Sequence, residues 1–237
     1  MAEVTWTANR LAADASRADT PRHAALVRVT HWLTAACFLA LLVSGLEIVV
    51  SHPRFYWGES GNVLTPALFS IPIPASRSTV PTGYGYVLPD QNGWSRYLHF
   101  QSAWLLVLTG ALYVIWGVAS GHFRDNLLPG TRLTWPAAAD ARSYNSIQRL
   151  TYLVVIFALF PLIIWTGLAM SPAFVSAVPA TVTILGGRQS ARTLHFVVTL
   201  LLVAFVLVHV AMVWRAGFRA RVNAMITGAS APAKGPA

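Results

Sequence analysis

Four apolar stretches of about 20 residues restrict this chain more than any other feature. They occupy residues 29–50, 97–119, 147–170 and 193–214. A helix of about 20 residues is about 30 Å long, which is the thickness of the hydrocarbon core of a bilayer. Only 11% of the residues are charged, against about 25% in soluble domains. The sequence therefore predicts an all-α fold, an integral membrane four-helix bundle.

The rest of the chain divides around these spans. We predict an arm at 1–27, a membrane domain at 28–221 with an external loop at 51–96, and a disordered tail at 222–237. The loop is rich in proline, glycine, serine and aromatic residues, and loops of this length are usually functional. Pro161 predicts a kink in the third span, because proline removes a helical hydrogen bond.

The distribution of positive charge predicts the orientation. Of the 17 lysines and arginines, 12 flank the spans on the side of the two termini and 5 lie on the other side. The positive-inside rule then places both termini in the cytoplasm and the loop at 51–96 outside. The net charge of +9 therefore indicates topology in a bacterial cytoplasmic (inner) membrane. Nucleic acid is not an expected partner.

Four histidines lie inside the predicted spans, where an unsatisfied ring nitrogen is costly. They are His31, His99, His195 and His209. The last two are separated by 14 residues, which is about 21 Å and about 3.9 turns of one helix, so both rings share a face. One metal ion cannot bind both, because metal–nitrogen bonds are about 2 Å long. The spacing predicts two haems stacked at two depths of the membrane.

Depth in the membrane predicts how the histidines pair. His31 and His209 lie toward the cytoplasmic side of their spans, whereas His99 and His195 lie toward the outer side. We therefore expect each haem iron to have two histidine ligands, from different helices at the same depth. The three remaining histidines lie in the arm or at span edges, where solvated or interfacial side chains are expected: His23, His52 and His122.

Arginine precedes three of the four span histidines by three residues. The arginines are Arg28, Arg96 and Arg192. Three residues are about one helical turn toward water on the same face, so these guanidinium groups could bind the haem propionates. Alternatively, they anchor the helix ends at the membrane interface.

Glycines accompany the histidines of the first two spans. Gly45 follows His31 by 14 residues and Gly110 follows His99 by 11, so each shares its histidine's face. A glycine there would let a haem macrocycle pack close to the backbone, although small residues also serve ordinary helix packing in membranes. The third span contains Gly167 and no histidine, so we expect it to pack or shield without binding iron.

The combined pattern resembles a known family. His31-Trp32, His99, the His-x13-His of the last span and the stretch Tyr144–Leu150 are similar to di-haem cytochrome b membrane subunits. These include the subunits of formate dehydrogenase, thiosulfate reductase and nickel–iron hydrogenase, and the bacterial cytochrome b561 proteins. The resemblance covers about residues 22–221. It implies two non-covalent b haems and a quinone site with Asn145 and Gln148, residues that could otherwise cap or anchor the third span.

The expected function follows from this resemblance. The chain would transfer electrons between the quinone pool and a periplasmic oxidoreductase subunit, such as a molybdenum enzyme, docked on residues 51–96. No residue is expected to be catalytic, because the cofactors carry the redox chemistry. The first alternative is a freestanding cytochrome b561-type quinol oxidase. The second, a proton-coupled transporter, is disfavoured because we find no inverted repeat and no paired broken helices.

Overall fold

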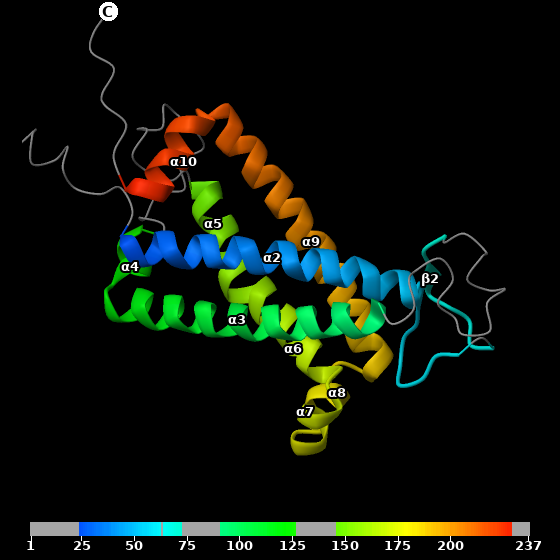
Figure 1. Cartoon of the computed structure of the whole chain (residues 1–237). Helices are drawn as coiled ribbons and strands as arrows, with labels where there is room; N and C mark the ends of the chain where they lie inside the picture. Colours follow the sequence, from blue (N-terminus) through cyan, green and yellow to red (C-terminus); the bar gives the residue numbers. More distant parts are fainter. Residues whose placement is uncertain (1–23, 63, 73–90, 127–145, 229–237) are drawn as a thin grey trace, which may run out of the picture. The chain divides into compact units, whose positions relative to one another are not determined.

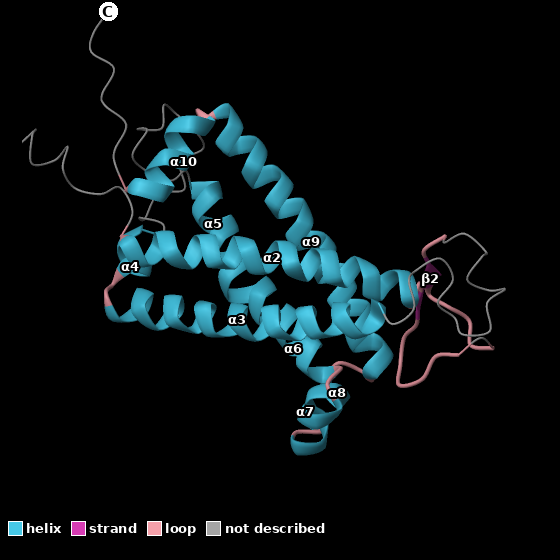
Figure 2. Cartoon of the chain, viewed as in Figure 1, coloured by secondary structure: helices cyan, strands magenta, loops and turns pink. Residues whose placement is uncertain are grey.

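The computed structural model describes residues 24–62, 64–72, 91–126 and 146–228 (Figure 1). These residues form two compact units. One contains the described residues up to Leu33 together with those from Val206 onward, and the other contains the described residues between Thr34 and Phe205. Helix is the dominant secondary structure in both (Figure 2).

The described residues include four helical segments long and apolar enough to cross a membrane, at Ala25–Val50, Gly93–Ala119, Leu150–Ala169 and Arg188–Arg215. They confirm the predicted spans. The helices themselves are α2 (Ala25–Ser51), α3 (Gln91–Ala119), α5 (Ser146–Val154) continued by η2 (Val155–Leu159) and α6 (Phe160–Ala169), and α9 (Arg188–Arg215). Several of them begin before the predicted apolar stretch because polar residues at the interface continue the helical hydrogen bonding.

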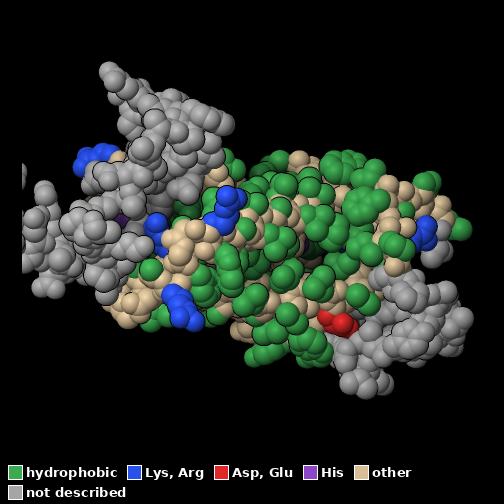
Figure 3. Space-filling model, turned by 90° about the horizontal axis from the view of Figure 1, so that it is seen from above, with side chains coloured by type: hydrophobic (Ala, Val, Ile, Leu, Met, Phe, Trp, Pro, Cys, Tyr) green, Lys and Arg blue, Asp and Glu red, His purple; other side chains and the backbone are tan. Residues whose placement is uncertain are grey.

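The surfaces of these helices are apolar. Between 11% and 22% of the residues in each most apolar window are buried inside the protein, so most of the leucine, valine and phenylalanine side chains face outward. Hydrophobic side chains dominate the face shown in Figure 3. Water would disfavour such a surface, whereas the hydrocarbon core of a bilayer accommodates it.

The third span contains a π-helical segment one turn before Pro161, the residue at which a kink was expected. In the π-helical segment η2, the Phe160 N–H donates to the Val155 carbonyl, five residues back. Pro161 follows in the first turn of α6. Proline has no N–H and its ring clashes with the carbonyl four residues earlier, and a π turn is one way in which a continuous helix accommodates this.

Shorter elements connect the spans. Strands β1 (Arg54–Phe55) and β2 (Phe69–Ser70) pair antiparallel, with Arg54 opposite Ser70. Short helices α4 (His122–Asn126), α7 (Pro172–Ala177) and α8 (Ala180–Ile184) follow spans two and three.

Helix α10 (Phe218–Thr227) follows α9. Residues 222–227, which we assigned to a disordered tail, are therefore helical. Gly217 (φ 96°) and Gly228 (φ 82°) bracket α10 in the left-handed conformation, which glycine adopts without steric cost. These two glycines turn the chain away from α9 and end the new helix, a boundary that apolar patterning alone does not reveal.

Candidate functional site

The structure brings the four span histidines together in the two predicted pairs. His31 of α2 faces His209 of α9, with ring centroids 6.3 Å apart and ring planes at 50°. His99 of α3 faces His195 of α9, with centroids 6.2 Å apart and planes at 56°. The first pair lies within one compact unit and the second within the other.

These separations suit one iron atom between each pair. An iron–nitrogen bond of about 2 Å and a distance of about 1 Å from each nitrogen to its ring centre place two trans imidazole centroids about 6 Å apart. No cluster of three or more histidine, cysteine or acidic side chains that could hold a metal occurs among the described residues. Two imidazoles therefore need a partner that brings its own equatorial ligands, as haem does.

The His31 ring supplies a further observation that fits a bound group. Its Nδ1 atom is buried and has no hydrogen-bond partner among the described residues. Buried polar atoms are normally satisfied by protein, by water or by a ligand. The Trp32 indole lies beside this ring in an edge-on arrangement, with centroids 5.1 Å apart. The residues present therefore fit a planar iron cofactor held between histidines.

A serine and a glycine of α2 contact the His99 ring. Ser44 is fully buried, and its Oγ lies 3.0 Å from His99 Nδ1. The same hydroxyl donates to the Ala40 carbonyl at 2.7 Å. A Cβ placed on Gly45 would lie 3.6 Å from His99 Cε1, so the α2 backbone passes directly along the edge of the ring.

A threonine and a glycine of α6 make the same contacts with His195. Thr166 is also fully buried, with Oγ1 3.0 Å from His195 Nδ1. Its hydroxyl donates to the Leu162 carbonyl at 2.8 Å. A Cβ on Gly167 would lie 3.4 Å from His195 Cε1. The third span, expected only to pack or shield, therefore contacts a candidate ligand directly.

Ser44 and Thr166 are site residues that the sequence analysis missed. The available signal was a repeated pair, a hydroxyl residue followed by glycine, at Ser44-Gly45 and Thr166-Gly167. Such pairs are common at helix contacts in membranes. Only the tertiary structure shows that both of these contact a histidine.

The other predicted site residues have varied surroundings. Gly45 lies against the His99 ring, whereas a Cβ on Gly110 would have no neighbour within 4 Å. Arg96 is exposed. Asn145 lies outside the described residues, and Gln148 lies in α5 with a side chain that the structure does not describe. The roles of these residues toward haem and quinone remain predictions.

Two of the three predicted propionate arginines bond to backbone carbonyls. Arg28 donates to the Ile226 carbonyl at 3.2 Å. Arg192 donates to the Arg54 carbonyl, and its guanidinium lies 5.4 Å from the Phe55 ring centroid. Each arginine also has a buried Nε without a partner among the described residues. Contact with a propionate is compatible with these positions and stays a prediction.

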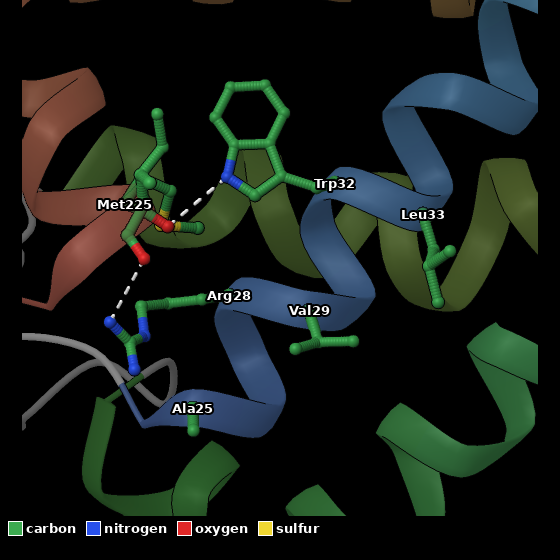
Figure 4. Close-up of a pocket in the computed structure, with 7 residues that line it drawn as sticks. Ala25, Arg28, Val29, Trp32, Leu33 and Met225 are labelled. Carbon is green, nitrogen blue, oxygen red and sulfur yellow. Dashed lines mark hydrogen bonds between the residues drawn. The ribbon is translucent and has the colours of Figure 1, made fainter.

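A shallow groove lies beside Trp32 (Figure 4). Figure 4 shows Arg28 and Trp32 extending from α2 toward α10, where the Trp32 indole N–H donates to the Met225 carbonyl at 3.2 Å. The groove is lined by Ala25, Arg28, Val29, Trp32, Leu33, Met225 and Ile226. The groove is thus mainly apolar with one cation at its edge.

Residues 91–96 of the predicted loop belong to helix α3. An earlier part of the loop, called the 52–72 segment here (residues 52–62 and 64–72), folds onto the start of α9. The Gly58 N–H donates to Ser190 Oγ at 2.7 Å, and its carbonyl accepts from the Gln189 N–H at 2.9 Å. Thr193 Oγ1 donates to the Tyr56 carbonyl at 2.7 Å. The segment is therefore attached to the turn of α9 that precedes His195.

Aromatic packing reinforces this attachment. Phe55 is 2% exposed and packs between Phe69 and Phe196, with ring centroids at 4.7 and 4.5 Å. Other large apolar side chains of the same segment face outward, among them Trp57, Leu64 and Leu68. Leu64 is 89% exposed and Leu68 is 61% exposed. The 52–72 segment thus has aromatic side chains packed on α9 and other apolar side chains exposed, here called its open face.

Comparison with known proteins identifies the family. The family described as prokaryotic cytochrome b561 matches residues 22–228. A protein of Azospira oryzae named "Putative protein-methionine-sulfoxide reductase subunit YedZ1" is 29% identical over 207 residues, covering 81% of this chain and 89% of its own. The membrane-spanning helices and the family make the chain a multi-pass protein of the bacterial inner membrane that carries b-type haem in electron transfer. The chain belongs to the prokaryotic cytochrome b561 family.

Proposed function

We propose that this protein holds two b haems and transfers electrons across the membrane, between the quinone pool and an external oxidoreductase subunit. The observation that carries the proposal is the pair of histidine contacts at 6.3 and 6.2 Å. Both pairs use α9, whose two histidines are 14 residues apart. His31 with His209 and His99 with His195 would be the axial ligands, and each haem would supply a one-electron couple.

The protein between the two histidine levels of α9 is apolar and well packed. Val198 and Leu202 are buried there and form a cluster with Val155, with Phe160 and Phe205 packed around it. Such packing excludes water from the region between the two ligand levels. It would provide a low-dielectric medium beside the His99–His195 level. Arg28, Arg96 and Arg192 would meet the propionates toward the two aqueous sides.

We assign the His31–His209 level to the cytoplasmic side, with both termini in the cytoplasm. The excess of lysine and arginine around the termini supports this orientation. Quinone would exchange near this level, at Asn145 and Gln148. The apolar groove is lined by Trp32, whose indole contacts the His31 ring, and this lining is consistent with an apolar ligand at that level.

An absorption spectrum tests the proposal. We expect the dithionite-reduced minus oxidised difference to show b-type bands, and haem quantification to give two haems per chain. A quinol should reduce the same bands in membranes. Fewer than two haems per chain, or no b-type signal, would refute the di-haem proposal. Reduction by dithionite but not by any quinol would refute the quinone link alone.

The external partner would bind the 52–72 segment. The apolar side chains of its open face are exposed, and the relative's name describes a reductase subunit. Exposed apolar patches of this kind are typical of protein interfaces. We therefore propose a periplasmic catalytic subunit as the occupant of this face.

Charge placed on the open face should weaken the complex. We expect Leu64→Asp with Leu68→Asp to reduce co-purification of the partner at least tenfold, because carboxylates would be desolvated in an apolar interface. Haem content should not change. Ser70→Asp is the control, since it adds one of these two carboxylates at an exposed polar position of the same segment. A wild-type chain that oxidises quinol without any partner would contradict the docking proposal and favour the freestanding oxidase.

A further inference from the structure

We infer that Ser44 and Thr166 are positioning residues that set the orientation and electron-donor strength of His99 and His195. This inference rests on the proposed haem binding. It assigns a role to spans one and three at the His99–His195 level, where neither span contributes a histidine. Helix α2 would hold the ligand on α3, and helix α6 would hold the ligand on α9.

The direction of the two hydroxyl–histidine hydrogen bonds follows from the acceptor to which each hydroxyl already donates its hydrogen. The Ser44 O–H is donated to Ala40 at 2.7 Å, so its oxygen is left to accept from His99 Nδ1–H at 3.0 Å. The Thr166 O–H is donated to Leu162 at 2.8 Å, so its oxygen accepts from His195 Nδ1–H at 3.0 Å. A hydroxyl has one hydrogen to donate. Both rings are thereby held as the tautomer with a free Nε2 lone pair.

Backbone packing supports the same arrangement. Because Gly45 and Gly167 lie against Cε1 of the two rings, the Nδ1–Cε1 edge of each imidazole lies against helix backbone. The Nε2 atom of each ring would then be the one that binds iron.

This arrangement has a consequence for the bound iron. A hydrogen bond from Nδ1–H to an acceptor makes the imidazole a stronger donor to its metal and orients its ring. A stronger donor stabilises ferric iron relative to ferrous iron and lowers the reduction potential. The hydroxyls of Ser44 and Thr166 are neutral acceptors, weaker than a carboxylate. They would adjust the potential of this haem moderately while defining the ring orientation.

The test is a redox titration of the full-length membrane protein. We expect Ser44→Ala and Thr166→Val to retain two haems, because all four histidines remain. Each variant should shift the equilibrium of the His99–His195 haem toward the ferrous form by up to about tenfold. This corresponds to a rise in its reduction potential of about 59 mV for a one-electron couple. The ferric EPR signal of that haem should also change, since it depends on the relative orientation of the two imidazoles. The haem of His31 and His209 is the internal reference.

Two further variants separate hydroxyl chemistry from packing. Thr166→Ser keeps the acceptor oxygen and should restore the wild-type potential. Thr199→Val removes a hydroxyl that donates to the His195 carbonyl at 2.8 Å but makes no contact with the ring, so it should leave the potential unchanged. Should Thr166→Val lose the haem, retention in Thr166→Ser would still support the inference, and loss in both would overturn it.

The inference and the proposed function fail differently. Unchanged potentials and EPR signals in Ser44→Ala and Thr166→Val, with both haems present, would overturn the inference and leave the proposed function intact. A wild-type protein without two b haems would overturn the proposed function itself.

Discussion

Replacement of His195 by alanine is expected to halve the haem content, from two haems per chain to one. His195 and His99 face each other at 6.2 Å, so one iron would lose one of its two axial ligands. The remaining haem should be the one between His31 and His209, which makes no use of His195. His99→Ala should give the same result, because the two rings serve one iron. Pyridine haemochrome quantification and redox titration would measure the loss.

A matched control and a rescue sharpen this experiment. His52→Ala changes a histidine beyond the end of α2 and should retain both haems. In His195→Gly, added imidazole should occupy the space of the missing ring and restore part of the second b-type signal. Loss of the haem at His31–His209 in place of the other would refute the pairing.

Replacement of Gly187 by alanine is expected to detach the 52–72 segment from α9. Gly187 has φ +112°, and a Cβ there would lie 2.4 Å from the carbonyl carbon of Gly58. The left-handed conformation alone costs a residue with a side chain about 1–3 kcal/mol. The clash adds to this conformational cost, because the backbone of Gly58 cannot move aside as a flexible side chain would. The hydrogen bonds of Gly58 to Ser190 and Gln189 should be lost.

Limited proteolysis in detergent would detect this detachment as faster cleavage within the 52–72 segment. Binding of the proposed partner should fall as well, while both haems remain. Gly58→Ala is the matched control: its φ is +103°, but a Cβ there has no neighbour within 4 Å. It should show backbone strain without the clash, and hence a smaller effect. Equal cleavage rates of the 52–72 segment in Gly187→Ala and in the wild type would contradict its proposed attachment to α9.

The membrane spans and the histidine pairing could be derived from the sequence because both depend on fixed lengths. Bilayer thickness sets the length of an apolar helix, and the helical repeat relates His195 to His209 on one face. Depth in the membrane then leaves one partner for each of these two histidines. The structure brings the same two pairs together. The prediction of the pairs needed no information on helix packing.

Other features required the tertiary structure. Ser44 and Gly45 are adjacent in the sequence, but helical periodicity does not show that α2 is rotated so that both contact His99. The same holds for Thr166 on α6, and for Arg192, whose guanidinium contacts the 52–72 segment. Rotation of one helix against another depends on how side chains interlock across the contact, a long-range property that no local pattern contains. The amino-acid sequence by itself thus determined the membrane spans and the pairing of their histidines. The packing of the helices decided which side chains surround each histidine.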